Sequence, residues 1–207
     1  CAHHLKKAGI ASTVYEASER TGGRMFTATD LMGPGLHTEI GGEFIDSTHE
    51  DIMGLVKEFN LELIDLHAKE TPKVLRETFF FNGRHLTEAQ VVKAMVPLCK
   101  RIAADYDELG EVVNFENDGG GKALDQMSIT QYLDRIGARG VIRELLDVAY
   151  LTEYGLECGE QSALNLVFLI DRDPGDGFDM FGESDERYKV KGGNDRIVRE
   201  LAARLPG

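Results

Sequence analysis

The N-terminal stretch restricts the fold more than any other part of the sequence. It contains, in this order, a predicted helix, a glycine, a strand-like segment, an acid and a Gly-Gly-Arg turn. The opening CAHHLKKAG carries Lys6 and Lys7 where they suit the negative end of a helix dipole, and Gly9 where a helix ends. The next segment, IASTVYEA at 10–17, is rich in residues that favour strands. Helix, short turn and strand make half of a βαβ unit, so we expect the other strand and its loop to precede the helix.

Glu16 closes this predicted strand, and Gly22, Gly23 and Arg24 follow it. In a dinucleotide-binding βαβ unit, the second strand ends in an acid that accepts hydrogen bonds from the ribose hydroxyls. A carboxylate there also repels a 2′-phosphate, which disfavours NADP. The glycines permit close backbone approach, and the arginine can neutralise phosphate charge. The pattern predicts a dinucleotide site, with an ordinary solvated turn as the alternative.

Capping boxes predict where three helices begin. They pair a Ser or Thr with a Glu or Gln three residues later: Ser47 with Glu50, Thr87 with Gln90, and Ser128 with Gln131. We expect the second helix to run to about residue 115 and Gly137 to end the third. A further helix is expected at 139–150, a buried helix from Ser162, and a strand and helix within 188–205.

Turn residues predict a hairpin and two loops. Asn82 and Gly83 supply the positive φ of a tight turn within a hairpin at 73–86. The stretches 117–126 and 171–179 are predicted as loops. The second resembles a calcium loop but lacks the glycine at its sixth position, so we interpret it as a solvated acidic loop. The histidines show no ligand spacing, and no metal site is predicted.

Composition limits the class of protein. The 207 residues carry a net charge of −13, with 42% hydrophobic and 29% charged residues, as in soluble globular proteins. The negative charge argues against nucleic acid and could attract cationic amines, although solubility alone also explains it. No apolar run approaches the roughly 18 residues that cross a membrane. Cys1, Cys99 and Cys158 are widely spaced, which favours free thiols and a cytoplasmic location, with the periplasm as the alternative.

Four stretches together resemble the flavin-containing amine oxidases, relatives of monoamine, polyamine and L-amino-acid oxidases. They are EASERTGGR at 16–24, HTEIGGEFID at 37–46, LDQMSITQYLDRIG at 124–137 and YKVKGGNDRIVRELAARL at 188–205. The first also occurs in phytoene desaturases and protoporphyrinogen oxidase, whereas the other three favour amine oxidases. The resemblance covers nearly the whole chain. It implies an α/β fold with an incomplete FAD/NAD(P)-binding Rossmann-like domain and a helix-rich α+β substrate domain.

The resemblance also implies a role for each part of the chain. Residues 1–70 would form part of the FAD-binding domain, 71–187 the hairpin and helices of the substrate domain, and 188–207 a strand and helix that return to the FAD-binding domain. The implied reaction is hydride transfer from a small-molecule amine to FAD, with imine hydrolysis and peroxide formation. Neither nucleic acid nor membrane is an implied partner.

The site residues that the resemblance implies all contact the cofactor. Glu16 would bind the adenosine ribose with Ala17 beside it, and Arg24 would contact the phosphate region through Gly22 and Gly23. A second group would pass close to the flavin ring: Gly41, Gly42, Glu43 and Phe44. The Gly192–Gly193 pair is interpreted as a structural turn, and no catalytic residue is assigned.

Two parts of the family pattern are absent from these 207 residues. The glycine-rich GxGxxG loop, whose amides bind the pyrophosphate, would precede Cys1. The C-terminal third would supply the active-site lysine and complete the substrate cage. We therefore expect a fragment that neither retains FAD tightly nor oxidises an amine by itself.

Two other hypotheses stay open. One is a related flavin desaturase or dehydrogenase acting on a lipid-like substrate, which would need an apolar docking patch that 70–170 does not clearly provide. The other is a non-catalytic chain that forms a homo-oligomer by pairing an exposed strand edge at 12–17.

Overall fold

The computed structural model describes residues 1–68, 78–110, 112–114, 116, 119–173 and 179–205. The chain divides into two compact units. The first unit comprises Cys1–Pro72 and Ser184–Gly207, and the second comprises Lys73–Glu183. These bounds are geometric, and the cofactor and substrate roles of the two units stay predictions.

Helix α1 (Ala2–Lys7) opens the first unit and ends as predicted. Gly9 adopts a φ of 74°, and its N–H donates to the Lys6 carbonyl. The N–H of Ile10 donates to the Leu5 carbonyl. These two bonds form a Schellman motif, which satisfies carbonyl groups that the helix leaves unpaired.

The prediction of a strand at 10–17 is wrong. These residues form no strand, and Val14 and Tyr15 are 63% and 92% exposed. A strand needs a neighbour whose backbone completes its hydrogen bonds, and none of the strands in the described residues pairs with this segment. The segment therefore follows an irregular path, and the strand edge expected at 12–17 for self-association is not formed.

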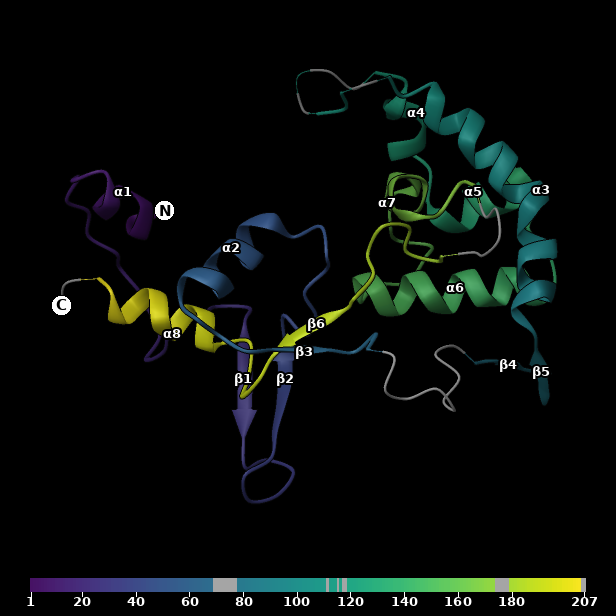
Figure 1. Cartoon of the computed structure of the whole chain (residues 1–207). Helices are drawn as coiled ribbons and strands as arrows, with labels where there is room; N and C mark the ends of the chain where they lie inside the picture. Colours follow the sequence, from purple (N-terminus) through teal and green to yellow (C-terminus); the bar gives the residue numbers. More distant parts are fainter. Residues whose placement is uncertain (69–77, 111, 115, 117–118, 174–178, 206–207) are drawn as a thin grey trace. The chain divides into compact units, whose positions relative to one another are not determined.

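Two antiparallel strand pairs organise the first unit (Figure 1). Strands β1 (Phe26–Thr29) and β2 (His37–Gly41) form a hairpin. Strand β3 (Leu63–Asp65) pairs with β6 (Tyr188–Val190), which joins the two sequence segments of the unit. Ile45 forms an isolated bridge to β6, so the chain that leaves β2 lies beside that strand.

Helix α2 (Glu50–Glu58) starts two residues later than its capping box predicts, with His49 as the N-cap. Ser47 does not cap the helix. Its N–H donates to Asp185 Oδ1 at 2.8 Å, and its hydroxyl donates to the other carboxylate oxygen. A partner far along the chain has therefore replaced the predicted local cap.

Helix α8 (Arg196–Ala203) follows β6 as predicted and completes the first unit. Six buried apolar residues form the core of this unit: Ile45, Val56, Phe59, Leu61, Val190 and Ile197. They come from α2, β6, α8 and the connecting segments, so the core holds both sequence segments of the unit together.

The second unit begins with the predicted hairpin, formed by β4 (Phe79–Phe81) and β5 (Arg84–Leu86). Asn82 and Gly83 adopt φ values of 51° and 74°, the pair of positive values that a type I′ turn requires. Residues 73–77, where the hairpin prediction starts, lie outside the described residues.

The remaining elements in the described residues of this unit are helical. They are α3 (Glu88–Asp107), α4 (Gly121–Asp125), α5 (Ile129–Ile136), α6 (Val141–Tyr154) and α7 (Ala163–Leu169). The capping boxes at Thr87 and Ser128 are both formed, and α7 begins after Ser162 as predicted, with the Ser162 side chain as its cap. Gly137, at a φ of 81°, ends α5 as predicted. Met95, Ile102, Tyr132, Leu133, Leu146 and Leu166 are among the fully buried core residues.

Three boundaries in this unit differ from the predictions. Helix α3 ends at Asp107 rather than near 115, and Gly110 just beyond it adopts a φ of 78°, which a helix cannot accommodate. Helix α6 continues past 150 to Gly155, whose left-handed conformation ends it. The loop predicted at 117–126 contains α4. Residues 117–118, and 174–178 of the predicted acidic loop, lie outside the described residues.

Candidate functional site

Glu16 lies in the irregular segment before β1 and is exposed to solvent. Its Oε1 accepts a hydrogen bond from the Ser18 N–H at 2.8 Å. That backbone bond, followed by a bond from the Ser18 side chain, lowers the pKa of Glu16 below its ordinary value. The carboxylate is therefore ionised at neutral pH and can accept hydrogen bonds from ligand hydroxyls. Ala17 beside it is also exposed.

Arg20 holds the turn that follows Glu16, although it is not among the predicted site residues. Its Nη2 donates to the Gly23 carbonyl at 2.6 Å, and its guanidinium carbon lies 4.5 Å from the centroid of the Phe26 ring. The arginine thereby fixes the glycine turn to the start of β1. Any arginine can bind a carbonyl and stack on a ring, so the sequence alone does not distinguish Arg20 from Arg24 in this role.

Arg24 is exposed and lies in the same segment of chain as Glu16. None of the ion pairs in the described part of the chain includes Arg24. The two predicted cofactor charges are thus not joined to each other. An unpaired, exposed guanidinium is well suited to a bidentate contact with phosphate.

The predicted glycines meet around Arg24 and Met25. A Cβ atom on Gly41 would lie 2.2 Å from the Arg24 carbonyl oxygen, and one on Gly22 would lie 2.6 Å from the Met25 carbonyl oxygen. Gly42, at a φ of 67°, lies against the Met25 side chain. Only glycine fits at positions 22 and 41. The two stretches that were predicted to share one ligand are therefore in direct backbone contact.

Glu43 and Phe44 are both held by Lys189 of β6, which is not a predicted site residue. The Lys189 Nζ lies 2.8 Å from Glu43 Oε1 and 4.4 Å from the centroid of the Phe44 ring. Because one cation contacts the acid and the ring together, it fixes two neighbouring side chains of the predicted flavin-facing segment relative to β6.

A polar network joins the β1–β2 hairpin to the start of α8. Thr27 Oγ1 donates to Glu39 Oε2 at 2.7 Å and accepts from the Asp195 N–H at 3.2 Å. Glu39 Oε1 accepts from the Asn194 N–H at 2.9 Å. Thr27, Asn194 and Asp195 are buried, and Asn194 is fully so. Asn194 is a further residue that no sequence pattern had marked.

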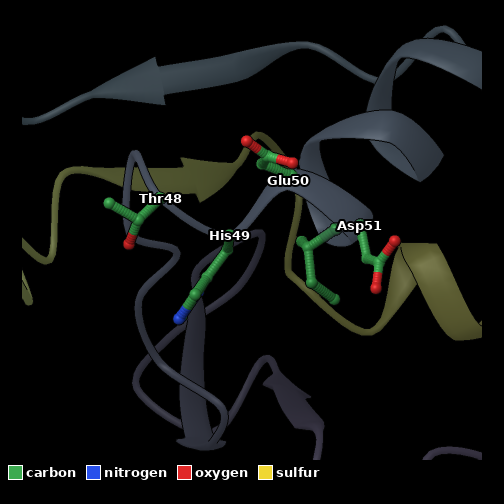
Figure 2. A pocket seen from close by; sticks show the side chains of 5 residues that line it. Thr48, His49, Glu50 and Asp51 are labelled. Atoms are coloured by element: carbon green, nitrogen blue, oxygen red, sulfur yellow. The ribbon is translucent and has the colours of Figure 1, made fainter. Parts of the chain in front are cut away.

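An open pocket of about 440 Å³ lies at the start of α2 and is lined by Thr48–Ile52 (Figure 2). Figure 2 shows the side chains of Thr48, His49 and Glu50 pointing in different directions. His49 Nε2 lies 3.4 Å from Asp46 Oδ2. None of the predicted cofactor residues lines this pocket, and its diverging side chains do not converge on one point.

In the described residues, no group of three or more His, Cys, Asp or Glu side chains could hold a metal ion. Among the helices of the same residues, none is both long enough and apolar enough to cross a bilayer.

Solved structures share this fold. Cyclohexylamine oxidase from Brevibacterium oxydans IH-35A matches with a TM-score of 0.78 and 21% identity, over 99% of this chain and 46% of that chain. A putrescine oxidase variant with one substitution matches with a TM-score of 0.72 and 21% identity, over the same shares of the two chains. The fold class is therefore α/β, that of the Rossmann-like amine oxidases, as the sequence resemblance implies.

Sequence comparison gives the family. The model of the flavin containing amine oxidoreductases matches residues 1–207. Achacin from Lissachatina fulica is 31% identical over 157 residues, which cover 66% of this chain and 29% of achacin. The chain belongs to the flavin-containing amine oxidoreductase family. It spans less than half the length of each of these relatives.

Proposed function

We propose that this chain supplies part of the FAD site of an amine oxidase. The observation that carries the proposal is the packing of Gly22, Gly41 and Gly42 around Arg24 and Met25, in a chain of this family. This packing brings the turn that carries the exposed guanidinium beside the turn predicted to face the flavin ring. A single extended ligand can therefore contact both turns.

The residues present fit part of a flavin dinucleotide. Glu16, ionised and exposed, would accept hydrogen bonds from the adenosine ribose, with Ala17 beside it. Arg24 would bind the phosphates next to Gly22 and Gly23. Residues 41–44 would lie along the flavin ring. When bound, FAD supplies a hydride acceptor for the amine-bearing carbon, after which water hydrolyses the imine and oxygen yields peroxide.

The two units would divide the work between cofactor and substrate. Residues 1–70 and 188–207 would bind the cofactor, and 71–187 would contribute to the substrate side. A small amine is the proposed substrate, since the matched structures are those of a cyclohexylamine oxidase and a putrescine oxidase. The free cysteines support a cytoplasmic location.

We further infer that polypeptide outside residues 1–207 completes the site, because the matched oxidases are more than twice as long as the region they share with this chain. The chain alone would then bind FAD weakly and leave amines unoxidised. It should purify without colour and bind added FAD in a titration followed by flavin fluorescence. Bound flavin that survives dialysis would contradict this inference.

Glu16→Gln tests the ribose contact directly. The change removes the charge from a group that would accept two hydroxyl hydrogen bonds, so FAD affinity should fall about tenfold or more. Glu19→Gln is the matched control, because it removes a nearby exposed charge with no proposed ligand role. Equal loss of affinity in both variants would indicate a general charge effect and would count against the proposed site.

A homo-oligomer is a second proposal, favoured by the exposed apolar side chains Val14, Tyr15, Leu31 and Met32 rather than by strand pairing. Sedimentation velocity at several concentrations should then show a rising average mass. A strict monomer throughout would exclude it.

A further inference from the structure

Asn194 uses its side chain to hold the turn formed by Gly42, Glu43 and Phe44, called here the 42–44 turn. Its Nδ2 donates to the carbonyl oxygen of Gly42 at 2.7 Å and to that of Glu43 at 2.9 Å. Its Oδ1 accepts from the Val190 N–H at 2.7 Å. Because a backbone N–H can only donate, the amide group is fixed with its NH₂ on the two carbonyls.

The direction of these carbonyls determines where the following N–H groups point. A trans peptide is planar, so its C=O and N–H point in opposite directions, and the described residues contain no cis peptide. The Gly42 and Glu43 carbonyls both point toward Asn194. The N–H groups of Glu43 and Phe44 therefore both point away from it. Within the described part of the chain, neither N–H group donates a hydrogen bond.

Two consecutive unpaired N–H groups on one side of a turn form a site for electron-rich acceptor atoms. Glu43 is exposed, so a ligand can reach this side of the turn. The ring carbonyl oxygens and unprotonated nitrogens of a flavin are acceptors of this kind. Lys189 adds to the order of the turn, because it holds the side chains of Glu43 and Phe44 while Asn194 holds the backbone.

We propose that Asn194 is a positioning residue that directs the N–H groups of Glu43 and Phe44 at acceptor atoms of the flavin ring. This inference rests on the proposed function, since the ligand is the flavin that the family uses. If Asn194 had only a structural role, it would still hold the 42–44 turn against β6. In that case FAD would not have to contact the Glu43 and Phe44 N–H groups.

Amide NMR of the isotope-labelled chain, titrated with FAD, tests the proposal without a variant. The Glu43 and Phe44 amide resonances should shift on titration more than those elsewhere in the 42–44 turn and β6. Binding of FAD without a shift of these two amides would overturn the proposal.

Asn194→Asp tests the role of the side chain. It keeps an oxygen for the Val190 N–H but replaces both donors with an oxygen that repels the two carbonyls. In the presence of FAD, faster hydrogen exchange at the Glu43 and Phe44 N–H groups than in the wild type is expected, together with about a tenfold loss of FAD affinity. Ser47→Ala is the matched control, because it removes a side-chain hydrogen bond between the same two sequence segments, to Asp185, without touching these carbonyls, and it should bind FAD as the wild type does.

The outcomes separate the two proposals. If the wild type binds FAD and Asn194→Asp binds it equally well, the positioning role is wrong while the proposed FAD site stands. If Ser47→Ala loses as much affinity as Asn194→Asp, Asn194 acts through stability alone and the positioning role is again wrong. If the wild type does not bind FAD at any concentration, both the proposed function and the positioning role of Asn194 are wrong.

Discussion

Gly193 packs directly against Thr27. A Cβ atom on Gly193 would lie 2.4 Å from Thr27 Cγ2 and 2.6 Å from Oγ1, and the φ of Gly193 is 108°. Both the space and the backbone conformation exclude a side chain. This contact fixes the turn before α8 to β1, and thereby places Asn194 beside the 42–44 turn.

Gly193→Ala should lower the free energy of unfolding by about 2 to 4 kcal/mol, because overpacking and strain at a positive φ add together. Gly54→Ala in α2 is the control. No atom lies within 4 Å of its Cβ position, so the change should stabilise the helix by about 0.5 to 1 kcal/mol. Urea unfolding measures both. If Gly193→Ala leaves the free energy of unfolding unchanged, the contact between Gly193 and Thr27 is looser than described.

Ser128→Ala removes the capping box of α5, in which the Ser128 hydroxyl accepts the Gln131 N–H and the Gln131 side chain accepts the Ser128 N–H. The expected loss of stability is about 1 kcal/mol. Thr152→Ala should change stability by less than about 0.5 kcal/mol, because among the described residues that exposed hydroxyl bonds only to carbonyls of its own helix. Thermal unfolding of the two variants compares them, and equal effects would argue against a working cap.

Features decided within a few residues are the ones that the sequence predicts. The caps at Thr87 and Ser128, the turn at Asn82–Gly83 and the end of α5 at Gly137 all form as expected. In each case the donor, the acceptor or the required φ belongs to residues at most four positions apart. No distant partner has to be known for such a prediction.

Features decided by distant partners are not predictable in this way. Ser47 binds Asp185 instead of capping α2, and 10–17 has no strand because none of the described strands pairs with it. For the candidate site, glycine spacing indicates positions 22 and 41, but not that they pack on each other. Lys189 and Asn194 act on residues about 150 positions away, so neither stands out in the sequence.

The ion pair of Asp65 with Arg187 should contribute to the free energy of unfolding in a way that depends on acid pH. Two hydrogen bonds from Arg187, at 3.0 Å and 2.8 Å, are the main reason that the pKa of Asp65 lies below its ordinary value of 3.8. A lowered pKa favours the ionised form in the folded state. The contribution is therefore fully present above pH 3.8 and is lost as the pH falls through the lower, folded-state pKa.

Urea unfolding of the wild type and Asp65→Asn should therefore differ at neutral pH and converge in acid. Glu62→Gln provides the comparison, since its ion pair with Lys191 is well exposed and should contribute little at any pH. A difference between wild type and Asp65→Asn that stays constant into acid would show that the Arg187 contact does not depend on charge.

The cysteines should differ sharply in reactivity. Burial raises the pKa of both Cys99 and Cys158 to about 11, whereas Cys1 is exposed. Since the thiolate is the nucleophile, the two buried thiols are almost entirely protonated near neutral pH and are also shielded from reagents. Iodoacetamide should therefore label Cys1 alone in the folded chain and all three cysteines in urea, as counted by mass spectrometry. Labelling of Cys99 or Cys158 at the rate of Cys1 under native conditions would mean that the helical core opens readily.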